Sequence, residues 1–234
     1  MKDKQNKKGF LMWFVVLMSV MILVVGGFYL YRGYQARVNI DNTTTISDNS
    51  YYTLRGNATA YQKEIYKELS DELNKDVRDD NKAVELVAKN YVADFFTWSN
   101  KLRFNDMGGA QYINRDIRKW VYDKALDTFY NDMYYYLEKG QVKDTLEVTD
   151  SVASVKNVKF VTEEEHYDSE LEEMVPAVEV DAFEVTISWT YKDSSVVSIA
   201  DFQKEAKIIV VKDSDGLYSI VEVSNGKTQE NPEA

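Results

Sequence analysis

The sequence predicts a membrane-anchored protein whose external part is an α+β domain, with helices packed on one face of a bent antiparallel sheet. Three observations lead to this prediction. An uncharged apolar run of 22 residues occupies positions 10–31. Apolar residues then recur with helical spacing as far as about residue 138, and after Gly140 they alternate with a period of two. Helices followed by a series of strands are typical of an α+β domain with one helical layer.

The run at positions 10–31 reads FLMWFVVLMSVMILVVGGFYLY. About 20 apolar residues in a helix span a hydrocarbon core of roughly 30 Å, so we predict a transmembrane helix. A cleaved signal peptide is the alternative. Its apolar region is only about 7–15 residues long and ends at a small-x-small site, which the bulky sequence around Tyr29 does not offer.

Charges on either side of the run predict its orientation. Four lysines lie in the tail at positions 1–9, so the positive-inside tendency places this tail in the cytoplasm and the C-terminal part outside. Residues 38–234 hold 22 Lys and Arg against 38 Asp and Glu. Because such an acidic surface repels phosphate groups, we expect no direct nucleic-acid binding, and contact with the membrane only through residues 10–31.

The chain contains no cysteine. An external domain of this kind has no disulfide framework and must be held together by an apolar core, which a single domain of about 175 residues can supply. Zinc–thiolate sites, iron–sulfur clusters and cysteine nucleophiles are excluded. The excess of lysine over arginine favours an AT-rich genome, as in low-GC Gram-positive bacteria.

Between the apolar run and the domain we predict a polar stalk over residues 32–57 and a linker helix over residues 58–79. The helix carries a narrow apolar stripe that repeats every four residues and consists of Tyr61, Ile65, Leu69, Leu73 and Val77. Because a helix turns every 3.6 residues, such a stripe suits a short contact with a globular body better than a long coiled coil. We expect the helix to dock on its own domain or on a neighbouring subunit through Ile65, Leu69 and Leu73.

The external domain is predicted to span residues 80–224. It begins with one helix that ends near Trp98 and a second from about Asn114 to Glu138, each identified by its apolar face. The predicted strands lie at about 146–160, 182–191, 206–212 and 217–223. Residues 225–234 are polar, and we predict a disordered tail.

No catalytic, cofactor or metal site is predicted. The lone histidine, His166, lies in an acidic segment that could bind a metal but equally suits a solvated hairpin loop. The turn at 213–216 begins like a calcium loop but lacks its twelfth-position Glu. Gly108 and Gly109 lack a phosphate-loop pattern, and there is no Gly-x-Ser-x-Gly nucleophile motif. We therefore expect no cofactor and no enzymatic activity.

Aromatic residues are the best candidates for a pocket. A curved sheet closed by helices often leaves a cone-shaped cavity that aromatic side chains line, although they can equally fill the core. The candidate pocket residues are Phe95, Trp98, Trp120 and Trp189. Two carboxylates, Asp94 and Asp127, lie on the same helices, and either could act as a base if burial raised its pKa.

The order of elements resembles that of the bitopic assembly subunits of type IV secretion and conjugation machines, including the TcpC-like proteins of Gram-positive bacteria. Residues 87–98, VAKNYVADFFTW, carry this resemblance together with the turn and long helix that follow. It covers most of residues 10–224 and implies an external domain with a nuclear-transport-factor-like, or cystatin-like, fold.

For function, the resemblance implies a non-enzymatic scaffold in the cell membrane that contacts other channel subunits and forms homo-oligomers. It carries over no individual functional residue. Two alternatives stay open: a small-ligand-binding or isomerase-like enzyme that uses the aromatic-lined cone, and another kind of envelope interaction protein.

Overall fold

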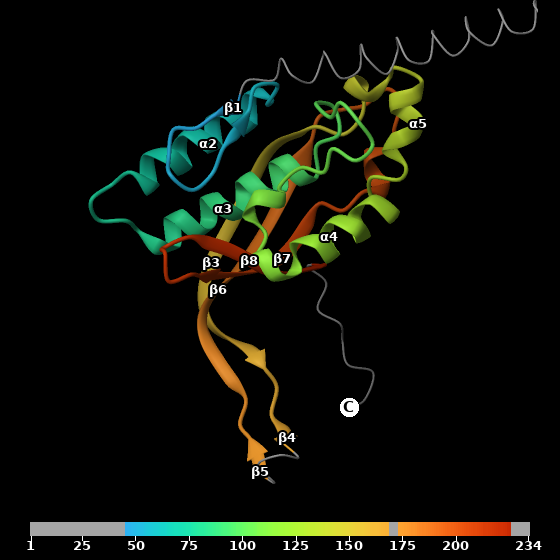
Figure 1. Ribbon diagram of the computed structural model, residues 1–234. Helices are drawn as coiled ribbons and strands as arrows, with labels where there is room; N and C mark the ends of the chain where they lie inside the picture. Colours follow the sequence, from blue (N-terminus) through green and yellow to red (C-terminus); the bar gives the residue numbers. More distant parts are fainter. Residues whose placement is uncertain (1–44, 169–172, 226–234) are drawn as a thin grey trace, which may run out of the picture. The chain divides into compact units, whose positions relative to one another are not determined.

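The computed structural model describes residues 45–168 and 173–225 (Figure 1). The predicted cytoplasmic tail, the predicted transmembrane helix at 10–31 and most of the predicted stalk lie outside these residues, as do positions 226–234. None of the helices in the described part has the length and apolar character needed to cross a membrane.

Residues 45–225 form an α+β body with its own core, as predicted. Its helices are α2 (Ala60–Leu73), α3 (Asp80–Phe95), α4 (Arg115–Asp127) and α5 (Met133–Glu138), with short 3-10 turns η1 (Ala110–Tyr112), η2 (Val142–Asp144) and η3 (Ile199–Asp201). The main antiparallel sheet has the order β3 (Val148–Glu163), β6 (Val178–Tyr191), β7 (Glu205–Lys212) and β8 (Tyr218–Asn225). Two short hairpins pair β1 (Thr45–Ile46) with β2 (Leu54–Arg55), and β4 (His166–Asp168) with β5 (Glu173–Val175).

Side-chain caps start the two long helices. The Thr59 hydroxyl accepts the Gln62 N–H, and the Gln62 side chain accepts the Thr59 N–H, which together form a capping box at α2. Asp79 accepts two N–H groups at the start of α3. α3 lies between α2 and the sheet, where it contacts β3 and β6, so it is buried on most of its surface.

α2 belongs to the body and is shorter than the predicted linker helix. Ile65, Leu69 and Leu73 are 4%, 0% and 2% exposed and belong to the hydrophobic core, where α2 packs against α3. The helix ends at Leu73, and Val77, the last residue of the predicted stripe, is 85% exposed. Of the two expected docking modes, the structure has the contact within the same chain, which leaves these three side chains no free surface for a partner.

The folded body also begins earlier than the predicted stalk allows, because residues 45–57 pack onto it. The Asn49 side chain accepts two backbone N–H groups of its own loop and donates to the Ser70 hydroxyl of α2 at 2.8 Å. Tyr52 is 1% exposed, and its hydroxyl donates to the Tyr218 carbonyl at 2.5 Å. Hydrogen bonds and the burial of Tyr52 and Leu54 hold this segment. Its sequence predicted a stalk because it is largely polar and has no periodic apolar pattern.

The helix predicted from Asn114 to Glu138 is divided into α4 and α5. At Thr128 the backbone leaves the helical region, with φ −123° and ψ −94°. This break turns Tyr130 into the core, where its hydroxyl donates to the Phe95 carbonyl at 2.6 Å and accepts the Gly108 N–H at 3.0 Å. A continuous helix would not allow Tyr130 to reach both groups, so the gain in buried hydrogen bonds accounts for the break.

The β3–β6 hairpin continues beyond the rest of the sheet (Figure 1). β6 pairs with β7 only from Ala182 to Ser188, whereas its pairing with β3 runs on to Val178. The β4–β5 pair lies farther along the same hairpin. We call residues 159–181 the arm.

Replacing Leu69 with Ala is expected to lower the free energy of unfolding by about 2–5 kcal/mol, because it leaves a cavity between α2 and α3. Urea unfolding followed by tryptophan fluorescence measures this loss. Val77→Ala, on the same predicted stripe but exposed, is the matched control and should cost less than about 0.5 kcal/mol. Equal effects of the two substitutions would contradict the packing of α2 described above.

Candidate functional site

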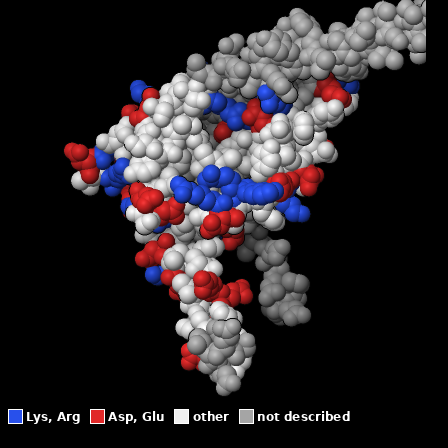
Figure 2. All heavy atoms as spheres, in the orientation of Figure 1, with Lys and Arg blue, Asp and Glu red and all other residues white. Residues whose placement is uncertain are grey.

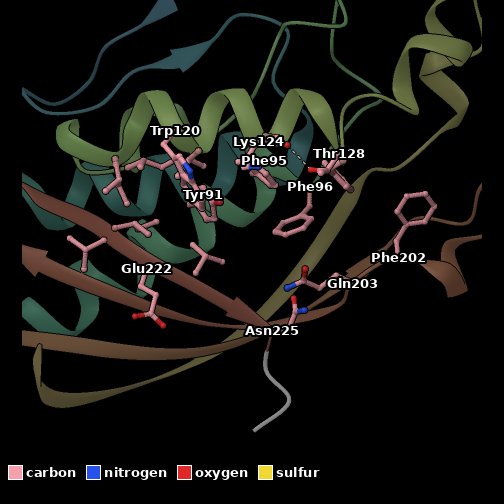
Figure 3. Close-up of a pocket in the computed structure, with 18 of the residues that line it drawn as sticks. Tyr91, Phe95, Phe96, Trp120, Lys124, Thr128, Phe202, Gln203, Glu222 and Asn225 are labelled. Carbon is pink, nitrogen blue, oxygen red and sulfur yellow. Dashed lines mark hydrogen bonds between the residues drawn. The ribbon is translucent and has the colours of Figure 1, made fainter. Parts of the chain in front are cut away.

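A cavity of about 590 Å³ lies between α4, α3 and β8 (Figure 3). This volume is within the range of about 300–1,000 Å³ that is usual for small-molecule sites. Its walls are largely apolar. The aromatic side chains that line it are Tyr91, Phe95, Phe96, Trp120, Phe129 and Phe202.

Few polar side chains reach this cavity. They are Lys124, Thr128, Asp201, Gln203, Glu222 and Asn225. Figure 3 shows the amides of Gln203 and Asn225 close to each other at the foot of the cavity, while the Glu222 carboxylate points away from the aromatic rings. The Thr128 hydroxyl donates to the Lys124 carbonyl at 2.7 Å, so it is satisfied within α4.

The structure brings two of the four predicted pocket residues to this cavity. Phe95 forms part of its wall, and Trp120 lies at its edge with 65% of its surface exposed. The other two fill the core: Trp98 is 0% exposed, and Trp189 packs against the Phe96 ring with a centroid separation of 4.4 Å. Both readings of the aromatic residues, pocket and core, therefore apply to different members of the set.

The two predicted candidate bases do not line the cavity. Asp94 lies in a separate ion cluster: its carboxylate accepts the Gly109 N–H at 2.7 Å and the Lys101 ammonium at 3.0 Å, with Arg55 Nε 3.5 Å away. Burial opposes ionisation of Asp94, but the charges of Lys101 and Arg55 and the Gly109 N–H outweigh it and lower its pKa to about 2. Asp94 is therefore an ionised carboxylate and not a base with a raised pKa, and Asp127 is exposed outside the cavity.

The ion cluster fixes the loop that follows α3. The Lys101 side chain is 0% exposed, and its ammonium also donates to the Asp94 carbonyl at 2.8 Å, near the C-terminal end of the helix. Arg55 donates to Asp106 at 2.8 Å, and the same carboxylate accepts the Leu102 N–H at 3.0 Å. The charges pair with one another, which indicates a structural role for this cluster.

The arm is the second candidate site. It holds one lysine against nine Asp and Glu, a formal net charge of −8. Figure 2 shows carboxylate groups distributed over the part of the molecule that projects below the body. Four large apolar side chains are nevertheless exposed on it: Val161 (42%), Tyr167 (61%), Met174 (54%) and Val178 (44%).

His166 lies in the arm, in β4 rather than in a loop. It is exposed, and its ring hydrogen-bonds the Glu164 carbonyl at 3.1 Å. Across the described ranges, no group of three or more His, Cys, Asp and Glu side chains is placed to hold a metal ion.

Sequence reasoning missed the arm as a structural feature and the buried position of Lys101. One signal for the arm was present, since no lysine or arginine occurs between Phe160 and Tyr191. Lys101 gave no signal, because a single lysine in a polar loop is normally solvated.

Comparison with family models, curated proteins and solved structures found no match for this chain.

Proposed function

We propose that this protein is a non-enzymatic, membrane-anchored assembly subunit of a conjugative or type IV secretion-like channel. Its tail at 1–9 lies in the cytoplasm, residues 10–31 cross the membrane, and the α+β body lies outside. The observation that carries this proposal is the arm, a hairpin that leaves the sheet and exposes apolar side chains.

Stability of the body does not explain the arm. Among the described residues, none between positions 159 and 181 belongs to the hydrophobic core. A two-stranded hairpin without a third strand is only marginally stable in water. Burying an exposed side chain such as Tyr167 or Met174 against another protein contributes about 1.5–3 kcal/mol for each side chain. Contact with a partner would therefore supply the stabilisation that the arm does not receive from the body.

The charge of the arm argues for a protein partner that is not another arm. Like-charged hairpins repel one another, which prevents their edges and apolar groups from pairing. The partner surface that fits is apolar at its centre and carries Lys or Arg around it, an arrangement usual for protein interfaces. Other channel subunits are the partners that the resemblance implies.

The small-ligand alternative is favoured by one observation, the cavity between α4 and β8. Neither of the two candidate bases supports catalysis in this cavity, because Asp94 is paired with cations and Asp127 lies outside the lining. Binding without catalysis is therefore the form of this alternative that the cavity supports.

Photocrosslinking tests the role of the arm. With a benzophenone amino acid at Tyr167 of the full-length protein in its own cells, we expect adducts with other envelope proteins. The same amino acid at Tyr135, which is 53% exposed on α5, is the matched control and should give few adducts.

Shortening the arm tests whether the contact matters. Replacing residues 162–177 with Asn-Gly should leave the unfolding of the body unchanged, because none of the described residues that it removes belongs to the core. The frequency of DNA transfer should fall by at least about tenfold, which corresponds to the loss of one side-chain contact worth about 1.4 kcal/mol. Normal transfer by this variant, together with no adducts at Tyr167, would rule out the arm as the assembly contact.

A further inference from the structure

We propose that the cavity between α4 and β8 binds an uncharged, largely apolar small molecule. This site is separate from the arm, and the inference does not depend on the scaffold function. It rests on the shape of the cavity, the rigidity of its walls and the charges around it.

The aromatic wall is held in place by its own contacts. Phe95 lies at the centre of a group of rings, with centroids 5.3 Å from Tyr91, 5.6 Å from Phe129 and 4.9 Å from Phe96. These separations are those of stacked and edge-to-face aromatic pairs. Because the rings fix one another, a ligand would enter a cavity that is already formed and would lose little affinity to ordering the wall.

The opposite wall is the apolar face of α4, and it is incompletely covered. Ile117 and Val121 line the cavity and remain half-buried, and Ala125 is the one residue of α4 that is fully buried. Trp120, one position away, is largely exposed at the edge. A bound apolar molecule would cover this face as the core of the protein covers α3.

The charges around the cavity oppose an anionic ligand, and its apolar interior disfavours an ionised group. One ammonium group, Lys124, and two carboxylates, Asp201 and Glu222, lie around an interior made of rings and aliphatic side chains. A charge carried into that interior would lose its hydration without a paired partner. An anion would also be opposed by the net charge of the chain, −11 at pH 7.

Neutral hydrogen-bonding groups lie at the foot of the cavity. Gln203 donates to the Glu205 carbonyl at 2.7 Å, which fixes the orientation of its amide, and Asn225 lines the same part of the cavity (Figure 3). A hydroxyl, ester or amide group on the ligand is the chemistry that such amides recognise.

The segment that directly follows β8 does not match the cavity chemically. Residues 226–234 read GKTQENPEA and contain no large apolar side chain. We take a separate apolar molecule as the occupant, because it matches the aromatic lining.

A pair of photoreactive probes tests this inference on the full-length protein in detergent: phenyl(trifluoromethyl)diazirine, which is neutral, and its benzoate analogue, which is anionic. After irradiation, peptide mapping locates the labelled residues. We expect saturable labelling of the α4 and β8 peptides by the neutral probe, and labelling weaker by at least about tenfold for the benzoate. Labelling of exposed apolar residues on the arm should be unsaturable and equal in all variants.

Filling the cavity provides the second part of the test. Ala125→Phe places a ring in the cavity from α4 and should abolish the saturable labelling, and Val121→Phe does the same from a half-buried position if the first variant fails to fold. Ala177→Phe, at an exposed position of the arm, is the matched control and should label like the natural chain. Equal labelling by the two probes, no saturable labelling at α4 and β8, or full labelling in a folded cavity-filling variant would each overturn the proposal.

Discussion

Replacing Gly108 with Ala is expected to destabilise the body by about 3 kcal/mol, which is among the largest effects expected of a single added methyl group. A Cβ atom at this position would lie 2.1 Å from the Asp94 carbonyl oxygen and 2.6 Å from its carboxylate. The carbonyl belongs to the last turn of α3 and cannot move without disturbing the helix. Gly108 also donates its N–H to the Tyr130 hydroxyl at 3.0 Å, so a shift of the loop would break that bond as well.

Gly140→Ala is the matched control for this prediction. Gly140 has a φ of +68°, and an added Cβ would meet no atom within 4 Å. Its substitution should cost only about 1 kcal/mol, the penalty of a left-handed conformation for a residue with a side chain. Chemical denaturation of the two variants side by side gives the comparison. Similar losses in both would show that the close approach of Gly108 to α3 is not what constrains this loop.

Lys101→Met is expected to cost about 3–5 kcal/mol, because it leaves the Asp94 carboxylate buried beside a single, more distant cation. Methionine keeps the length and apolar stem of lysine, so the loss reports the charge rather than the volume. Lys119→Met is the control: Lys119 pairs with Asp123, but its side chain is 85% exposed, and removal of such a pair should cost less than about 1 kcal/mol.

The pH dependence of stability provides a second measure of the same pair. Because the pKa of Asp94 is lowered to about 2 in the folded state, its contribution is fully present above the unfolded-state pKa of about 3.9 and is lost as the pH falls toward 2. In Lys101→Met the pKa of Asp94 rises, since burial is no longer offset by that ammonium. The free energy of unfolding of this variant should then begin to fall at a higher pH than that of the natural chain. The same dependence on acidic pH in both proteins would contradict the ion pair.

The helix-then-strand order was predictable because it depends on the local spacing of apolar residues. The strands predicted at 182–191 and 206–212 agree closely with β6 and β7. The phase of a helix was less informative: Ile117, Trp120 and Val121 share one face of α4, which predicts that all three are buried. Trp120 is exposed because α4 lies at the edge of the body, where none of the described elements covers it.

Features that depend on contacts between distant residues could not be predicted. Asn49 attaches the segment predicted as a stalk to α2 through hydrogen bonds. A single asparagine in a polar segment gives no sequence signal of such a role. Lys101 is buried with its ammonium paired to Asp94 of α3, whose carboxylate and carbonyl both accept from it. The length of the arm was hidden because its acidic residues are typical of a solvated loop.

The attachment of the β1–β2 hairpin determines how the body would respond to mechanical load. Tension applied at Thr45 would meet the polar contacts that join this hairpin to α2 and its C-cap, among them those from Asn49 to Ser70 at 2.8 Å and from Asn74 to the Asp48 carbonyl at 2.9 Å. α2 in turn transmits the load to α3 over a broad apolar contact. The Tyr52 hydroxyl also joins the same loop directly to the Tyr218 carbonyl of β8 at 2.5 Å, so a load on Thr45 would reach the sheet by two routes, one through the helices and one through this bond.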